Sequence, residues 1–97
     1  MTYKIIYKPY AERDMWEIVD CLSEHSVSAA QKFLRKLKEK IEGLSEMPFR
    51  YPKINSQQEY RKMSVDKYVV AYLVDELQGH VLIIRVVHGM RNYQNDI

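Results

Sequence analysis

Residues 81–93, which read VLIIRVVHGMRNY, decide how this chain folds. The β-branched and aliphatic side chains of VLIIRVVH predict a strand over residues 81–88. Arg85 and His88 interrupt this apolar run. Because successive side chains of a strand point to opposite faces, Arg85 is expected to share the face of the aliphatic residues two positions away, and His88 to lie on the other face.

Three more strands are predicted around this one. YRKMSV at 60–65 and YVVAYLVD at 68–75 are rich in strand-forming residues, and Gly79 can take a positive φ in the turn that leads to the last strand. Such short connections favour an antiparallel meander. TYKIIYK at 2–8 alternates in polarity and predicts a first strand, ended by Pro9, which lacks a donor for the strand ladder.

Two amphipathic helices are predicted between the first strand and the meander. Apolar residues recur at three- and four-residue intervals over 11–22, and acidic residues including Asp14 fill the outer face. A second apolar stripe runs over 30–44, with Lys and Arg on its outer face and Pro48 as its stop. Ser26 and Ser28 are candidate N-caps, the latter with a glutamine three residues on, as in a capping box.

The order of elements is strand, helix, helix, strand, strand, strand. Each helix needs a surface on which to bury its apolar stripe, so the helix hairpin must cover one face of the sheet. The sequence therefore predicts an α+β fold. A single domain over residues 1–97 would have an N-terminal strand and a two-helix hairpin packed on a mostly antiparallel four-stranded sheet. The acidic segment 10–25 and the basic segment 28–42 would attract each other if antiparallel.

Composition restricts the function. Fifteen Lys and Arg against thirteen Asp and Glu give a net charge of +2, which is little for a protein that binds nucleic acid mainly through phosphates. The single cysteine, Cys21, excludes an internal disulfide and a cysteine-type zinc site, and is expected to pack as a small apolar residue. Neither a metal nor another cofactor is expected. No membrane partner is expected either, since there is no long apolar run, and a cytoplasmic protein is predicted.

Three motifs carry a resemblance to a known family: PFRYP at 48–52, the pair Tyr60 and Arg61, and RVVHGMRN at 85–92. With the overall pattern of elements, they resemble the RelE/ParE superfamily of toxins from type II toxin–antitoxin modules, some of which serve in plasmid stabilisation. The resemblance implies a compact α+β toxin. It also implies a cognate antitoxin whose C-terminal segment wraps around the toxin, with a toxin–antitoxin hetero-oligomer as a possible form.

Two activities occur in that superfamily, and each implies its own site residues. RelE-like members cleave mRNA on the ribosome without a metal, which requires proton transfer and charge stabilisation. The catalytic candidates for that activity are Arg61, Lys67, His88, Arg91 and Tyr93. ParE-like members poison DNA gyrase. The target-binding candidates are Arg61, Lys62, Arg85 and Arg91.

Departures from the RelE-like pattern favour the ParE-like activity slightly. The position where RelE-like nucleases have an early strand arginine is here Val69, which cannot stabilise charge, and the chain is nearly balanced in charge. The alternatives are a ribosome-dependent mRNA endoribonuclease and a degenerate member without toxicity.

Structural explanations compete with these site assignments. Arg85 would pair with Asp75 or Glu76 at the core edge, and His88 would close a turn. Lys32, Lys36 and Lys40 would form a solvated helix face. Tyr3, Tyr7 and Tyr72 would be strand packing residues.

Overall fold

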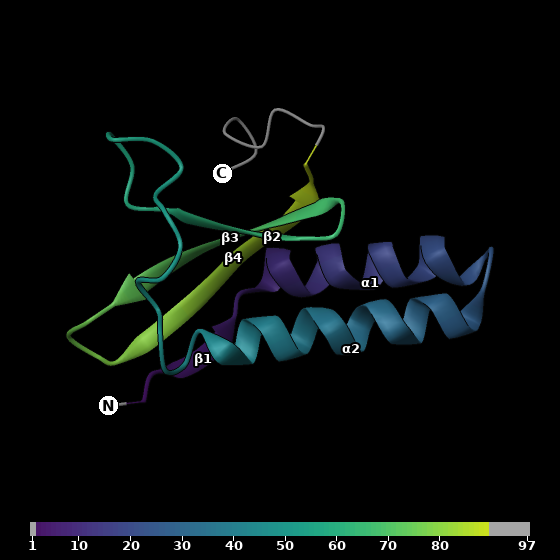
Figure 1. Cartoon of the computed structure of the whole chain (residues 1–97), viewed down its shortest axis with the longest axis horizontal. Coiled ribbons are helices and arrows are strands. Elements are labelled where there is room, and N and C mark those ends of the chain that lie inside the picture. Colours follow the sequence, from purple (N-terminus) through teal and green to yellow (C-terminus); the bar gives the residue numbers. More distant parts are fainter. Residues whose placement is uncertain (1, 90–97) are drawn as a thin grey trace.

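The structure is a computed structural model that describes residues 2–89. It contains six elements in the predicted order (Figure 1). They are β1 (Lys4–Tyr7), α1 (Pro9–Ser23), α2 (Val27–Gly43), β2 (Arg61–Val65), β3 (Tyr68–Asp75) and β4 (His80–His88). The predicted α+β architecture is confirmed.

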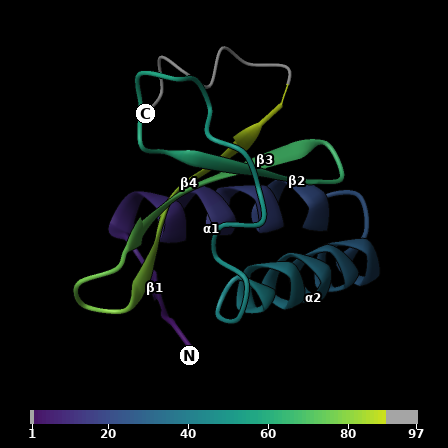
Figure 2. The same cartoon turned by 60° about the vertical axis from the view of Figure 1, so that its left-hand side comes forward.

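The sheet has the order β1-β4-β3-β2. The meander β2-β3-β4 is antiparallel, as predicted, and β1 joins it in parallel beside β4. This parallel pairing is possible because the helix hairpin carries the chain from β1 to β2 at the far edge of the sheet, and the meander then returns to place β4 beside β1. Both helices lie on the same side of the sheet (Figures 1 and 2), so that this side forms the core.

The ends of the helices follow from local chemistry. Pro9 begins α1 as well as ending the strand, because a proline fits the first helical turn, where its missing N–H is not needed. Ser26 is the N-cap of α2, and its Oγ accepts a hydrogen bond of 3.1 Å from the Ala29 backbone N–H. Ser28 lies inside the helix, so the alternative capping box is wrong. Gly79, with φ of 70°, makes the turn before β4, as predicted.

One apolar core joins the hairpin to the sheet. Its helix side includes Leu37 and Ile41, and its sheet side is centred on Tyr72, all of them fully buried. Tyr3 and Tyr7 pack against its margin, which confirms the packing role expected for these strand tyrosines. At ~25 cal/mol per Å² of apolar surface, burial of these side chains is the main force that holds the helices on the sheet.

Two expectations about α1 are wrong. Cys21 is exposed rather than packed, since the helix turns this position away from the sheet. Asp14, expected on the solvated face, is buried. Nor does an ion pair join α1 to α2 within residues 2–89, so their opposite charges attract only at longer range. No helix in the described part of the chain is long and apolar enough to cross a membrane.

Candidate functional site

Arg85 is fixed by a carboxylate that the sequence did not suggest. A register shift in the β3–β4 ladder pairs Ala71 with Arg85 but Tyr72 with Ile83, which leaves Ile84 as an extra residue. Arg85 Nε and Nη2 donate to Asp14 Oδ2 and Oδ1, at 2.7 and 3.1 Å. The expected partners Asp75 and Glu76 are therefore wrong, because the Arg85 guanidinium pairs with Asp14 of α1 instead.

Asp14 also closes an open edge of the sheet. Strand β1 pairs with β4 only as far as Ile83, so no other strand of residues 2–89 borders the following edge of β4. There the Val86 backbone N–H donates to Asp14 Oδ2 at 2.9 Å. One carboxylate thus satisfies a buried backbone donor and a guanidinium, and it joins α1 to the last strand.

Arg61 likewise has a structural partner. Its Nη1 donates to the Tyr51 carbonyl at 2.7 Å, and its guanidinium lies over the Phe49 ring, 5.1 Å from the centroid. Beside it, the Tyr72 hydroxyl donates to the Pro48 carbonyl at 2.8 Å, and burial raises the pKa of this phenol, which keeps it a donor. Both contacts hold the loop that follows α2.

The sheet register shows which candidate residues share a face. Lys62 pairs with Ala71, which in turn pairs with Arg85, so these two cations lie in one row on the side away from the helices. His88 pairs with Tyr68 and lies on the opposite side, where the two rings meet edge to face with centroids 5.4 Å apart. The prediction that Arg85 and His88 occupy opposite faces is confirmed.

The side of the sheet away from the helices is apolar at its centre. Val69, Ala71 and Val87 lie there and are all buried. Lys67 is exposed in the turn between β2 and β3, and its carbonyl accepts from the Gly89 N–H at 2.8 Å. A side chain at Gly89 would place its Cβ 3.2 Å from that carbonyl oxygen, which explains the glycine. Arg91 and Tyr93 lie outside the described residues.

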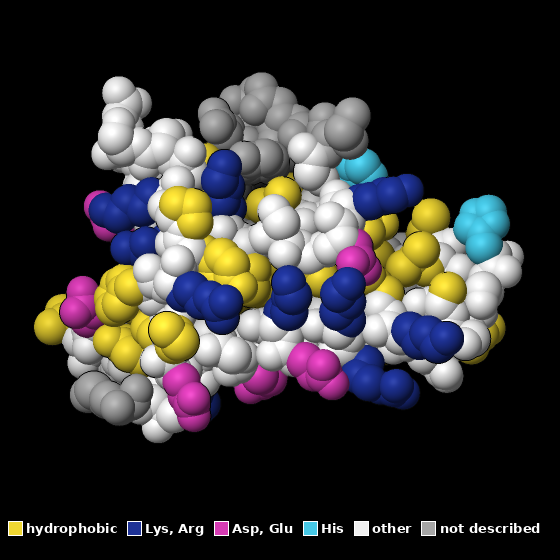
Figure 3. Space-filling view, viewed as in Figure 1, with side chains coloured by type: hydrophobic (Ala, Val, Ile, Leu, Met, Phe, Trp, Pro, Cys, Tyr) yellow, Lys and Arg dark blue, Asp and Glu magenta, His cyan; other side chains and the backbone are white. Residues whose placement is uncertain are grey.

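Basic side chains on α2 are spread out. Dark-blue Lys and Arg side chains follow the length of this helix in Figure 3 rather than forming one cluster. Lys36 forms an ion pair with Asp66 in the β2–β3 turn, and Lys32 and Lys40 are exposed. The expectation of a solvated helix face holds for these two lysines. Within residues 2–89, no group of His, Cys, Asp and Glu could hold a metal ion.

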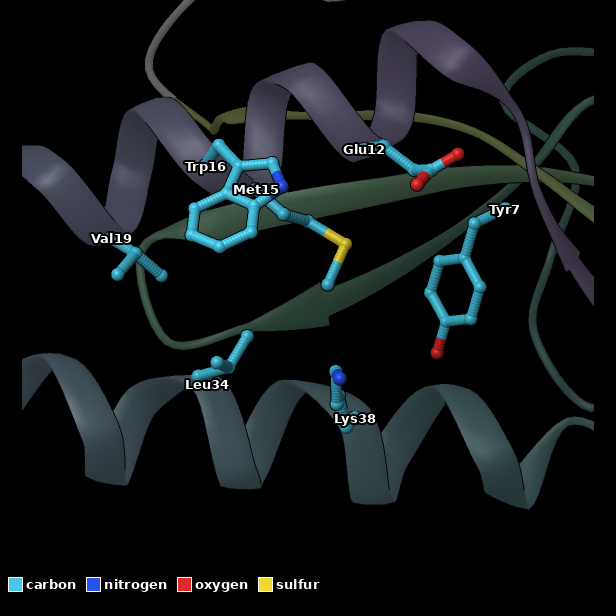
Figure 4. A pocket seen from close by; sticks show the side chains of 7 residues that line it. All are labelled: Tyr7, Glu12, Met15, Trp16, Val19, Leu34 and Lys38. Atoms are coloured by element: carbon cyan, nitrogen blue, oxygen red, sulfur yellow. The ribbon is translucent and has the colours of Figure 1, made fainter.

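A groove between the two helices lies beside exposed apolar side chains (Figure 4). It has a volume of about 310 Å³. Trp16, 69% exposed, stands on its α1 wall, and Leu34 on its α2 wall. The rest of its lining is Tyr7, Glu12, Met15, Val19 and Lys38. A large tryptophan exposed beside an apolar groove is typical of a surface that a partner covers.

Tyr7 forms the inner end of this groove. Its hydroxyl is buried, and no described residue accepts a hydrogen bond from it. Burial raises the pKa of Tyr7 to about 12, with a further contribution from the negative charge of Glu42. The phenol therefore stays protonated at neutral pH. Neither this hydroxyl nor Trp16 was predicted from the sequence to be a binding feature, although Trp16 is the single tryptophan of the chain.

Comparison with known proteins agrees with this geometry. The model of a protein family described as "ParE toxin of type II toxin-antitoxin system, parDE" matches residues 5–93. The chain belongs to the ParE toxin family. This settles the superfamily resemblance seen in the sequence. A comparison with curated proteins found no match.

Solved structures of toxins share this ParE-family fold. The chromosomal ParDE system of P. aeruginosa includes a chain with a TM-score of 0.78 and 13% identity, which covers 90% of this chain and 96% of that one. A chain of the RelBE2 toxin–antitoxin complex of Mycobacterium tuberculosis has a TM-score of 0.59 and 22% identity, and the match covers 91% of this chain and 99% of that one. A mutant of the E. coli toxin RelE in the free state has a TM-score of 0.71 and 16% identity, and the match covers 99% of this chain and 93% of that one. At these identities the likeness concerns the fold.

Proposed function

We propose that this ParE-family toxin inhibits growth by binding and poisoning a protein target, DNA gyrase, rather than by cleaving RNA. The observation that carries the proposal is the way in which Arg61, a catalytic candidate, is held: its Nη1 donates to the Tyr51 carbonyl and its guanidinium lies over the Phe49 ring. A guanidinium fixed to the toxin's own loop is ill placed to stabilise a phosphorane-like transition state, which requires a positive charge directed at the phosphate.

The other candidate groups support the same function. Metal-free RNA cleavage needs an acid or base and a cation that act on the same phosphodiester. His88, the natural proton-transfer group, pairs with Tyr68 at the start of β3, whereas the candidate cation Arg61 pairs with Tyr72 further along the strand. Val69 supplies an apolar side chain where a charge would be needed. These features favour a protein that recognises its target by surface contacts.

A supercoiling assay tests the gyrase target. Purified toxin is expected to inhibit gyrase in proportion to its concentration, because the proposed mechanism is stoichiometric binding. Toxin denatured by heat serves as the control. Unchanged supercoiling at a large molar excess of folded toxin would exclude this target. In that case the alternative is a RelE-like ribonuclease, in which Arg91 and Tyr93 would be the catalytic residues. If the protein is not toxic after induction, it is a degenerate member of the family.

We also propose that an antitoxin neutralises this toxin by placing an amphipathic helix in the groove beside Trp16. Two of the similar structures are titled as toxin–antitoxin systems or complexes. The wall of α1 carries Glu12 and that of α2 carries Lys38, so an occupant with opposite charges on its two flanks would match both walls. Apolar anchors of such a helix would cover Trp16 and Leu34.

Replacing Trp16 with alanine is expected to weaken binding of the antitoxin by about 30-fold, as for a central aromatic anchor. The ligand in the calorimetric titration is the candidate antitoxin, to be sought in a small reading frame that overlaps or adjoins the toxin gene. Val27→Ala is the matched control, since Val27 is also exposed, at 61%, but lies outside the groove. Equal affinities for the two variants would exclude the groove as the docking site.

A further inference from the structure

We infer that the loop at residues 47–51, MPFRY, is the element with which the toxin contacts its target, through Phe49 as an apolar anchor and Arg50 as a cation beside it. The partner surface would be a pocket on a protein, apolar inside and bordered by a carboxylate. This inference rests on the proposed function, poisoning by surface contacts, and names the part of the toxin that makes them.

The backbone of this loop is held rigidly from inside the protein. At its start, the fully buried Tyr72 donates its hydroxyl to the Pro48 carbonyl at 2.8 Å. At its end, Arg61 donates to the Tyr51 carbonyl at 2.7 Å, and the Lys62 N–H donates to the Pro52 carbonyl at 3.1 Å. A loop fixed in this way loses little conformational entropy when it binds, which favours affinity.

The side chains between these anchors point into solvent. Met47 is 58% and Phe49 46% exposed, although two neighbours hold the Phe49 ring in place. Tyr3 meets it edge to face with centroids 6.4 Å apart, and the Arg61 guanidinium lies over it. Folding alone does not require this arrangement, because an exposed phenylalanine adds little to stability. Rigid exposed aromatic residues beside arginine are enriched in the energetic centres of protein interfaces.

The charge beside the anchor selects the partner. The Arg50 guanidinium lies 5.6 Å from the centre of the neighbouring Tyr51 ring, and no carboxylate within residues 2–89 forms an ion pair with it. The loop and the end of α2 also border a hollow of about 250 Å³. Met47, Arg50 and Tyr51 of the loop line it together with Glu39, Lys40, Gly43 and Leu44, so its charged residues are two cations and one carboxylate. A partner side chain that enters this hollow would bring an acceptor within reach of Arg50.

The occupant is the target rather than the antitoxin. The groove proposed for the antitoxin is lined by residues of β1, of α1 and of α2 up to Lys38, and includes no residue of the loop. An apolar and cationic patch separate from that groove fits a second protein with the opposite charge.

The test combines a loop variant with a matched control. Phe49→Ala/Arg50→Glu removes the anchor and reverses the charge, and leaves the residues that hold the loop intact. Leu77→Ala is the control, because Leu77 is an apolar residue that is 100% exposed in the β3–β4 turn. Growth after induction and gyrase supercoiling are measured for both variants and the wild type, together with thermal unfolding. We expect the loop variant to keep its melting temperature but to need about 30-fold more protein for half-inhibition of gyrase, and to be no longer toxic.

Each outcome separates this inference from the proposed function. A folded loop variant as toxic as the wild type would overturn the inference, whatever the target is. If the wild type is toxic without inhibiting gyrase and the loop variant is harmless, the inference holds and the gyrase target is wrong. A wild type without toxicity would overturn both. A loop variant with a lowered melting temperature is replaced by Arg50→Glu alone, judged by the same criteria.

Discussion

Replacing Asp14 with alanine is expected to lower the free energy of unfolding by about 3 to 5 kcal/mol, the cost of removing one partner from a buried ion pair. The side chains of Asp14 and Arg85 are only 11% and 21% exposed. The substitution leaves the guanidinium without its carboxylate and also the Val86 N–H without its acceptor. A domain of this size has about 5 to 15 kcal/mol of stability, so a large share would be lost.

Urea unfolding followed by circular dichroism measures this effect. The control is Glu17→Ala, which removes the exposed pair between Arg13 and Glu17, whose side chains are 73% and 66% exposed. That change is expected to cost less than about 1 kcal/mol, because water screens such pairs. If the Asp14 variant were as stable as this control, the carboxylate would not join α1 to β4 in the way described.

Replacing Tyr72 with phenylalanine is expected to cost about 1 to 3 kcal/mol, because the buried Pro48 carbonyl then loses its donor. The ring itself stays, so the apolar core is preserved. The loop at 47–51 would lose one of its internal anchors, and hydrogen exchange of the loop amides should become faster. Stability and exchange are measured on the same sample.

Tyr68→Phe is the matched control for this change. Tyr68 lies on the same face of β3, but its hydroxyl forms no hydrogen bond with the described residues. Its loss is expected to change stability by less than about 0.5 kcal/mol. An equal loss in both variants would mean that the hydrogen bond to Pro48 does not anchor the loop.

Hydrophobic periodicity predicted the elements well. All six appear in the expected order, and β3 has the predicted bounds. The spacing of apolar residues along the chain predicts each helix and strand, and the same apolar residues are the ones that the fold buries. The parallel neighbour of β4 was not specified in advance, because strand order depends on contacts between residues far apart in the sequence.

The site was less predictable because one inserted residue changes side-chain direction. Simple alternation placed Arg85 on the face of Val81 and Ile83, but the bulge at Ile84 separates them. Asp14, which follows the acidic pattern of α1, gave no sign that it would be buried against a strand edge. Sequence identified Arg61 and the PFRYP motif as distinctive, but could not show that the first anchors the second.

The most direct test of the central claim is primer extension on a message translated in the presence of purified toxin. The message is expected to stay intact at toxin concentrations that inhibit gyrase. Cuts at the ribosomal A site that appear with the wild type and vanish with Arg91→Ala would contradict it, and would show that the toxin is a nuclease.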